Sequence, residues 1–258
     1  MNRRAGTFIY PGLVLILGLA LWQFAATNLK IAFWILPSPA KVLSVFTHKP
    51  DLLLFHLRFT LAATISGFGI SILLGMLTAV LMDCFKLLKL SLYPYMVISQ
   101  TIPVIAIAPL LILWFGYGIS SKIFTVILTC FFPIALNFYD GLSGVNVEQI
   151  RLLKSMGASG WKIFRYLKLP AAMPNLFTGL KLSATYSVMG AIIGEWLGGN
   201  GGLGIYMTRA TKSFDTQVVF AVILLIVFLS MALFLLISAA ERILLKWKYQ
   251  KIEEYEEV

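Results

Sequence analysis

The stretch VVFAVILLIVFLSMALFLLISAA, which runs from Val218 to Ala240, decides the class of fold, because it contains no charged side chain. A helix needs about 20 mostly apolar residues to cross the hydrocarbon core of a bilayer. Each Leu, Ile, Val or Phe at the centre of such a helix favours insertion by about 0.3–0.6 kcal/mol. The stretch therefore predicts a membrane-spanning helix.

The composition of the whole sequence supports the same class. Hydrophobic residues make up 59% and charged residues 12% of the 258 residues, whereas charged residues make up about 25% of ordinary soluble domains. We therefore expect an all-α membrane protein that forms a single domain over residues 1–258, with about six spanning helices and a core at 60–243. The expected spans are 8–27, 60–82, 91–115, 119–139, 174–197 and 217–241.

The first apolar stretch has two possible interpretations. Arg3 and Arg4 precede it, as basic residues precede the apolar core of a secretory signal peptide. However, the stretch is long, and the tripeptide FAA at 24–26 departs from the small-residue pattern of a cleavage site. We expect an uncleaved anchor helix at 8–27.

The distribution of basic residues predicts the orientation, because Lys and Arg are retained in the short loops on the cytoplasmic side. If the N-terminus lies inside, the inner segments carry thirteen Lys and Arg residues and the outer segments carry seven. This bias places both termini and the loop 140–173 in the cytoplasm. It also accounts for most of the formal net charge of +10, so the charge does not indicate a nucleic-acid partner.

The sequence carries no pattern that indicates catalysis or a metal site. Cys84 and Cys130 fall in or at the end of expected spans and are interpreted as small apolar side chains, while His48 and His56 fall in an expected outer loop. The GxxxxGK[ST], GxSxG and HExxH patterns of phosphate loops, hydrolases and zinc proteases are absent. We expect no enzyme activity and no cofactor in this chain, so another subunit must supply any energy.

The third expected span is rich in proline. Pro94, Pro103 and Pro109 each remove a backbone donor and disturb the preceding turn, so this helix is expected to be kinked or broken. In lipid the freed carbonyl groups need partners from protein or water, which favours a position beside a cavity. A kink packed against neighbouring helices is the alternative, and proline alone does not separate the two.

Small and hydroxyl side chains follow the fifth expected span, and Ser183, Ser187 and Gly190 are among them. Small residues permit close helix packing, which is one interpretation. The other is a translocation path, in which these residues face the proline-rich span, with Pro103 and Pro109, across a cavity near the middle of the membrane.

Two ionisable residues, Lys181 and Glu195, fall within this span. Charges at membrane depth are costly and often mark functional sites. Lys181 lies close enough to the inner end for its ammonium group to reach the lipid headgroups. Glu195 precedes the turn GGNGG at 198–202. It either anchors the outer interface or contributes to an outer gate, so it joins the candidate path residues.

A polar interruption, EQIRLLKSMGASGWKIFRYLKLP, separates two long apolar stretches at Glu148–Pro170. One apolar stripe at helical spacing precedes the segment GASG at 157–160, and a second stripe of Trp161, Phe164 and Leu167 follows it. The pattern predicts two short helices joined at a bend. Because an apolar stripe favours burial, we expect a soluble partner at this surface. A basic loop that rests on lipid headgroups is the alternative.

These residues resemble the cytoplasmic "EAA" loop of binding-protein-dependent ABC importer permeases. In that family the loop runs EAA, three residues, Gly, nine residues and then I-x-L-P. Gly157 and the segment LKLP at 167–170 stand at the matching spacing. The glutamate of the pattern is absent, because Arg151, Leu152 and Leu153 occupy the three EAA positions.

Further segments stand in the order seen in the nitrate, sulfonate and taurine branch of that family. The chain is similar to this branch over roughly residues 34–245, and permeases for pyrimidine precursors of thiamine share the similarity. The segments are LPSP at 36–39, IP at 102–103 with APL at 108–110 and WFGYG at 114–118, and GGLG at 201–204.

The resemblance implies a type I ABC importer permease with a cytoplasmic coupling-helix loop at 140–173. In that family two permease subunits form the path, each docks its loop in a separate ATPase subunit that binds ATP and Mg, and an extracytoplasmic binding protein delivers the solute. For this chain it implies a homodimer in a bacterial cytoplasmic membrane that imports a small polar solute. The coupling residues that it assigns are Arg151, Gly157, Ala158, Ser159, Trp161, Phe164, Leu169 and Pro170.

Two other classes of function are weighed against the importer. A secondary transporter that works without an ATPase usually has paired repeats with broken helices in both halves, whereas only the third span carries such signals here. A membrane-embedded enzyme needs a nucleophile, a metal cluster or an acid/base pair at one depth, and the sequence shows none. Copurification of an ATPase would separate the importer from the secondary transporter.

Overall fold

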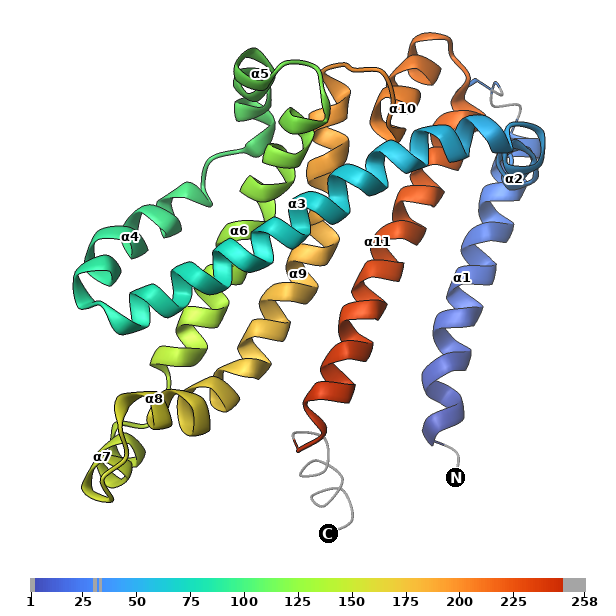
Figure 1. The fold of residues 1–258 in the computed structure, drawn as a ribbon. Helices are drawn as coiled ribbons and strands as arrows, with labels where there is room; N and C mark the ends of the chain where they lie inside the picture. Colours follow the sequence, from blue (N-terminus) through green and yellow to red (C-terminus); the bar gives the residue numbers. More distant parts are fainter. Residues whose placement is uncertain (1–2, 30–31, 33, 248–258) are drawn as a thin grey trace.

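The computed structural model describes residues 3–29, 32 and 34–247, with the side chains of residues 3–9 and 11 outside the description, and the described chain is helical apart from its connecting segments (Figure 1). Four segments in it are long and apolar enough to cross a membrane. They are α3 (Pro50–Cys84), α6 (Ile119–Ser143), α11 (Thr216–Leu244) and the continuous segment Gly160–Trp196, whose main part is α9 (Leu169–Trp196).

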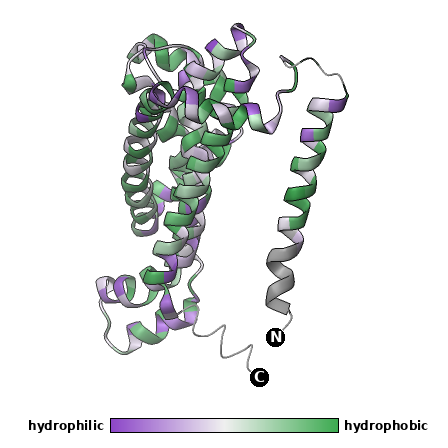
Figure 2. Ribbon diagram, turned by 90° about the vertical axis from the view of Figure 1, so that its right-hand side faces the viewer, coloured by the Kyte–Doolittle hydropathy of each residue, from purple (hydrophilic) through white to green (hydrophobic). Residues whose placement is uncertain are grey.

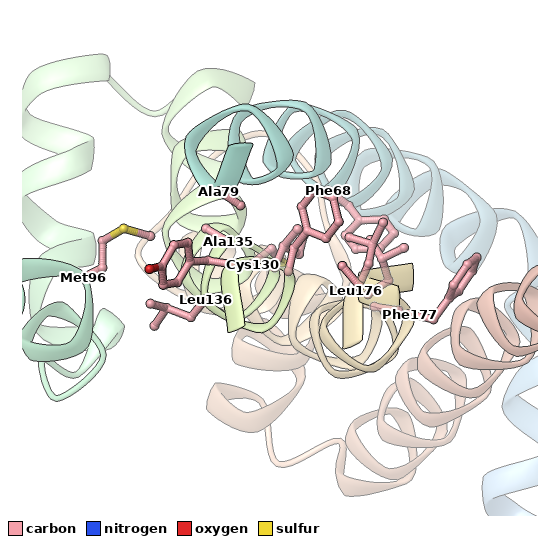
Figure 3. Packing of buried hydrophobic residues seen from close by; sticks show 14 of the residues in the cluster. Phe68, Ala79, Met96, Cys130, Ala135, Leu136, Leu176 and Phe177 are labelled. Carbon is pink, nitrogen blue, oxygen red and sulfur yellow. The ribbon is translucent and has the colours of Figure 1, made fainter. Parts of the chain in front are cut away.

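Helix α6 forms the centre of the bundle, because α3 and α9 both pack along it (Figure 3). Glycines permit this close approach. A Cβ atom at Gly67 of α3 would lie 2.6 Å from Cβ of Val126, and one at Gly179 of α9 would lie 2.9 Å from the carbonyl oxygen of Pro133. Lipid tails are as apolar as the side chains, so packing contacts of this kind hold spanning helices together.

The third expected span is broken into α4 (Lys86–Ser99) and α5 (Val104–Phe115), which are bent by 105° relative to each other. The break lies beside Pro103, which is the N-cap residue of α5. Because proline has no backbone N–H, no donor is left unpaired at this position. Pro94 and Pro109 lie inside α4 and α5 without breaking them. The prediction of a broken helix is confirmed, and only one of its three prolines lies at the break.

Helix α1 (Arg3–Asn28) stands apart from the bundle (Figure 2). Trp22 links it to the rest, since its indole Nε1 donates to the carbonyl of Pro37 at 3.0 Å and its ring packs against Phe220 of α11. Its apolar stretch Gly12–Asn28 is shorter than the four spans. The described helices therefore give four spans, or five if the bent pair α4–α5 counts as one, and the expected six is reached only when α1 is included.

The two ends of the bundle carry different short helices. At one end lie α7 (Val147–Ser155) and α8 (Gly160–Ile163), together with the start of α1 and the end of α11 (Figure 1). At the other end lie α2 (Pro39–His48), α5 and α10 (Leu203–Lys212) (Figure 1). The described ends of the chain thus share a side with the polar interruption.

The structure differs from one expectation about loop residues and does not describe part of another. Helix α3 begins at Pro50 rather than at residue 60, so the expectation of His56 in an outer loop is wrong and this residue lies inside the helix. The basic residues Lys30, Lys248 and Lys251, which enter the charge count, lie outside the described residues.

Candidate functional site

The polar interruption folds into two short helices joined at a bend, as its sequence predicts. Helix α7 begins after Asn146, whose side chain accepts a hydrogen bond from the N–H of Glu148 at 2.8 Å. The bend includes Gly157, which has φ of +79° and donates its N–H to the carbonyl of Lys154 at 3.0 Å. Glycine reaches this left-handed conformation without the steric cost that other residues carry. The side chain of Ser159 then caps α8.

The second short helix is continuous with a spanning helix. Helix α8 passes through one turn of π-helix, η1 (Phe164–Lys168), directly into α9. The N–H of Leu169 donates to the carbonyl of Phe164, five residues earlier, and the next residue, Pro170, has no N–H to donate. The regular hydrogen-bond ladder cannot run through a proline, which accounts for the π turn at this point. A movement of α8 therefore reaches α9 without passing through a flexible loop.

Several large apolar side chains of this loop are exposed, and the ribbon of the loop mixes hydrophilic and hydrophobic residues (Figure 2). The exposed fractions are 67% for Trp161, 74% for Met156 and 62% for Leu152. Trp161 stacks on Phe164 with ring centroids 5.8 Å apart, and Phe164 is half-buried against the core. We call Leu152, Met156 and Trp161 the loop patch. An exposed apolar patch with a polar surround is typical of a surface that a partner covers.

The remaining predicted coupling residues lie around the loop patch. Arg151 is exposed on α7 and forms no ion pair with the described residues. Ala158 is half-buried at the bend and donates its N–H to the carbonyl of Leu153 at 2.9 Å. Together with Gly157 it closes the end of α7, so this part of the loop has a defined shape.

An ion pair ties the loop to α3. Lys168 Nζ lies 2.6 Å and 2.9 Å from the two carboxylate oxygens of Asp83, in the last turn of α3. The Asp83 side chain is only 9% exposed. An ion pair between fully exposed groups contributes about 0–1 kcal/mol, whereas a buried carboxylate depends more strongly on its partner. The pair therefore joins the end of α3 to the junction between the loop and α9.

At the opposite end, three consecutive N–H groups that begin α10, those of residues 202–204, donate to buried side chains of two other helices. Their acceptors are, in chain order, His56 Nδ1 at 3.1 Å, Thr60 Oγ1 at 2.9 Å and Glu195 Oε2 at 2.7 Å. The first N–H groups of a helix lack partners within it, so these side chains satisfy them and fix α10 to α3 and α9. We call this arrangement the outer clamp.

Glu195 is the central residue of the outer clamp and is fully buried. Its other oxygen, Oε1, accepts from Thr60 Oγ1 at 2.8 Å. Lys122 is 3% exposed and donates to the carbonyl of Gly201 at 3.1 Å. A buried carboxylate needs hydrogen-bond donors such as those that contact Glu195.

The predicted site residues do not include His56 and Thr60. Together with Thr64 they recur every four residues, so they share one face of α3, and all three are buried. A polar stripe inside an apolar helix marks an internal polar contact. It becomes visible in the sequence only when the helix is extended back to Pro50, because the expected span begins at residue 60.

A second ion pair lies at the same end as the outer clamp. Lys49, between α2 and α3, places Nζ 2.8 Å from Asp215 Oδ2, which precedes α11. The hydrogen bond to Asp215 raises the pKa of Lys49. The pair links the starts of α3 and α11.

Ser183 and Gly190 lie in the contact between α9 and α6, and Ser187 is buried on the same helix. Both serines are fully buried, and the Ser183 hydroxyl donates to the carbonyl of Cys130 at 3.0 Å. A Cβ atom at Gly190 would lie 2.5 Å from Oγ1 of Thr129. The structure thus places these three residues in helix packing, which is the first of the two interpretations of this small-residue stripe.

Lys181 is ion-paired rather than extended toward the lipid headgroups. Its Nζ lies 2.8 Å from Oε2 of Glu241 in α11, whose side chain is 2% exposed. The expected snorkelling is wrong, because the acidic residue that ends the last expected span provides a partner inside the bundle.

A cavity of about 440 Å³ lies between the broken third span and α9. Its wall includes the break itself, with Gln100 and Pro103, and side chains of α6. The α9 part of the wall runs from Tyr186 to Trp196 along one face. The third and fifth expected spans border this open cavity, but Ser183, Ser187 and Gly190 of α9 do not line it. Pro109 does not line it either.

A bundle of spanning helices with an open cavity beside a broken span, a clamped helix at one end and an exposed apolar patch on a loop at the other is the arrangement of a membrane transport subunit. Residues 71–247 match the family model described as "Binding-protein-dependent transport system inner membrane component", and the chain belongs to this family. It is therefore a multi-pass permease subunit of an ABC importer, whose ATP hydrolysis takes place on a separate ATPase and whose solute comes from a binding protein.

Curated relatives cover nearly the whole chain. The formylaminopyrimidine transport permease protein ThiX of Halalkalibacterium halodurans is 38% identical over 95% of this chain and 98% of the relative. The riboflavin transport system permease protein RibX of Chloroflexus aurantiacus is 33% identical over 93% and 92%. The putative aliphatic sulfonates transport permease protein SsuC of Bacillus subtilis is 30% identical over 89% and 84%.

Solved structures of ABC transporters share the fold. A crystal structure of an amino acid ABC transporter with histidines has a TM-score of 0.63 at 19% identity, and the match covers 78% of this chain and 97% of the other. The MetNI methionine ABC transporter in an inward-facing conformation has a TM-score of 0.54 at 20% identity, over 76% and 97%. The fold is thus that of ABC importer permeases.

Proposed function

We propose that this permease couples ATP hydrolysis on its ATPase to import through the loop at 148–170. The loop patch carries the proposal, because Leu152, Met156 and Trp161 are exposed at the polar end of the bundle, where a soluble partner can cover them. Basic side chains such as Arg151 surround the patch, so the complementary groove on the ATPase is expected to be acidic.

The continuity of the helices supports a mechanism for this coupling. Closure of an ATPase dimer would move α7 and α8 together, with Gly157, Ala158 and Ser159 holding the bend between them. Because α8 runs through η1 into α9, past Leu169 and Pro170, the movement would reach the spanning helix directly. The Lys168–Asp83 pair would move α3 with it, as a hinge or shear motion of packed helices.

The assembly is proposed to be a homodimer of single permease domains, each with its core at 60–243 and both termini in the cytoplasm. Two observations support this orientation: the basic residues favour that side thirteen to seven, and the start of α1 and the end of α11 lie at the end that carries the loop (Figure 1). A reporter active only in the cytoplasm should work when it is fused after Gly160 and fail after Lys49. A working fusion at Lys49 would reverse the orientation.

The solute is proposed to be a small polar molecule, either a sulfonate, nitrate or taurine-like anion or a thiamine-precursor pyrimidine. The path would pass the cavity beside Pro103, with the small residues Ser183, Ser187 and Gly190 packing its α9 wall against α6. Glu195 would set the position of α10 at the outer gate, on the side where the binding protein delivers solute. This role follows from its contacts with both α3 and the first turn of α10.

The proposal is tested by reconstitution. The chain, its ATPase and its binding protein are placed in liposomes, and uptake of solute is measured with and without ATP. ATP-dependent uptake is expected, and it should stop when the ATPase is left out. Uptake driven by an ion gradient in the absence of the ATPase would support a secondary transporter instead.

A further inference from the structure

We propose that the cavity at the break between α4 and α5 accommodates a neutral, planar heteroaromatic ring and disfavours a sulfonate or another anion. This inference rests on the proposed import function and deepens it, because it names the chemical class of the solute. The size of the cavity, its aromatic walls, its lack of charge and the geometry of the break each support it.

The cavity has the size and the walls of a site for a flat ring. Its volume of about 440 Å³ falls in the range of small-molecule sites, about 300–1,000 Å³. Phe132 of α6 and Tyr186 and Trp196 of α9 contribute aromatic rings to the wall. Aromatic side chains favour offset or edge contacts with other rings, and they bind nucleobase rings by stacking.

The polar groups of the cavity are neutral. In the described part of the chain its lining includes no Lys, Arg, Asp or Glu. The lining residues with polar side-chain groups are Ser99, Gln100, Thr129, Tyr186 and Trp196. Lys122, also on α6, is not among the lining residues and is engaged by the outer clamp. A sulfonate in this cavity would lose hydration without gaining a counter-ion, which is unfavourable.

The broken helix adds backbone groups of both signs. Within the described chain, no backbone group pairs with the carbonyl of Gln100 at the end of α4, nor with the N–H groups of Val104 and Ile105 at the start of α5. All three residues line the cavity. A helix C-terminus carries roughly half a negative charge and an N-terminus roughly half a positive charge, so the two ends offset each other. Such a pair favours a neutral molecule with both donors and acceptors over an ion.

The inference is tested by direct binding to the purified permease–ATPase complex, in the absence of the binding protein, which would impose its own selectivity. Cytosine is the neutral aminopyrimidine probe, and methanesulfonate and taurine are the charged probes. Ligand-observed saturation-transfer NMR measures the affinity for each. Cytosine should bind, while both sulfonates should show no saturable signal.

Variants of the cavity wall assign the signal to this site. Trp196→Leu should weaken cytosine binding by about tenfold, because it removes a stacking surface. Trp196→Phe keeps a ring and should retain most of the affinity. Trp114→Leu is the matched control, since Trp114 is exposed on α5 and does not line the cavity. Retention of the ATPase in each preparation shows that the variant is folded.

The outcomes separate this inference from the proposed function. Stronger binding of methanesulfonate or taurine, binding of no probe, or equal cytosine affinity in Trp196→Leu and Trp114→Leu would each overturn the inference while the ATPase remains bound and ATP-driven uptake persists. Failure of the proposed coupling would instead appear as a complex that does not assemble or does not use ATP.

Discussion

Gly202 lies directly against the carboxyl group of Glu195, and a Cβ atom added to Gly202 would overlap that group. Gly202 also has φ of +136°, which residues with a side chain rarely adopt. The close approach and the positive φ explain why the GGLG segment at 201–204 has glycine at position 202. Its backbone must pass close to the carboxylate so that three consecutive N–H groups can reach the acceptors of the outer clamp.

Substitution of this glycine should loosen the outer clamp. Gly202→Ala should lower the free energy of unfolding by about 1–3 kcal/mol, because it combines a strained φ with an overlap in a closed site. The measurement is the Tm of the purified chain in detergent. Gly69→Ala in α3 is the control, since a Cβ atom there meets nothing within 4 Å. Equal Tm values for the two variants would show that the clamp is not tight.

The Lys168–Asp83 pair should be required for coupling rather than for assembly. Lys168→Met and Asp83→Asn should each lower the amount of solute imported per ATP hydrolysed, because α3 would no longer follow the loop. The exchanged pair, Lys168→Asp with Asp83→Lys, should recover much of that ratio. Residues in direct contact show interaction energies of about 0.5–3 kcal/mol in such cycles. If the double variant loses as much import per ATP as the two single variants together, the ion pair does not connect the loop to α3.

Arg151 replaces the glutamate of the family pattern and tests whether the partner groove is acidic. Arg151→Glu should weaken the ATPase complex by about tenfold, because it would place like charges together across the interface. Lys86→Glu makes the same charge change elsewhere on the same side of the membrane and serves as the control. If Arg151 acts only in positive-inside anchoring, both variants will retain the ATPase equally.

Local sequence patterns predicted those parts of the structure that depend on neighbours in the chain. Apolar runs located the spanning helices, and Gly157 located the bend of the loop. They did not predict which proline would break the third span, because Pro94 and Pro103 look alike without their tertiary surroundings. The outer clamp was not predicted because its residues lie far apart in the sequence. Thr60 and Glu195, for example, are separated by 135 positions. The sequence did not predict which face of α9 borders the cavity, because small residues can either line a path or pack against another helix.

Binding of the ATPase by a permease with an altered loop patch tests the central claim most directly. Trp161→Ala removes the exposed aromatic side chain of the patch, and Trp114→Ala removes one that is 64% exposed on α5 at the other end. A buried interface tryptophan commonly contributes at least about 2 kcal/mol, or roughly 30-fold in affinity. The measurement is the amount of ATPase that copurifies with each variant. We predict that Trp161→Ala loses most of it while Trp114→Ala retains it, and equal retention by both would contradict docking of the ATPase on this loop.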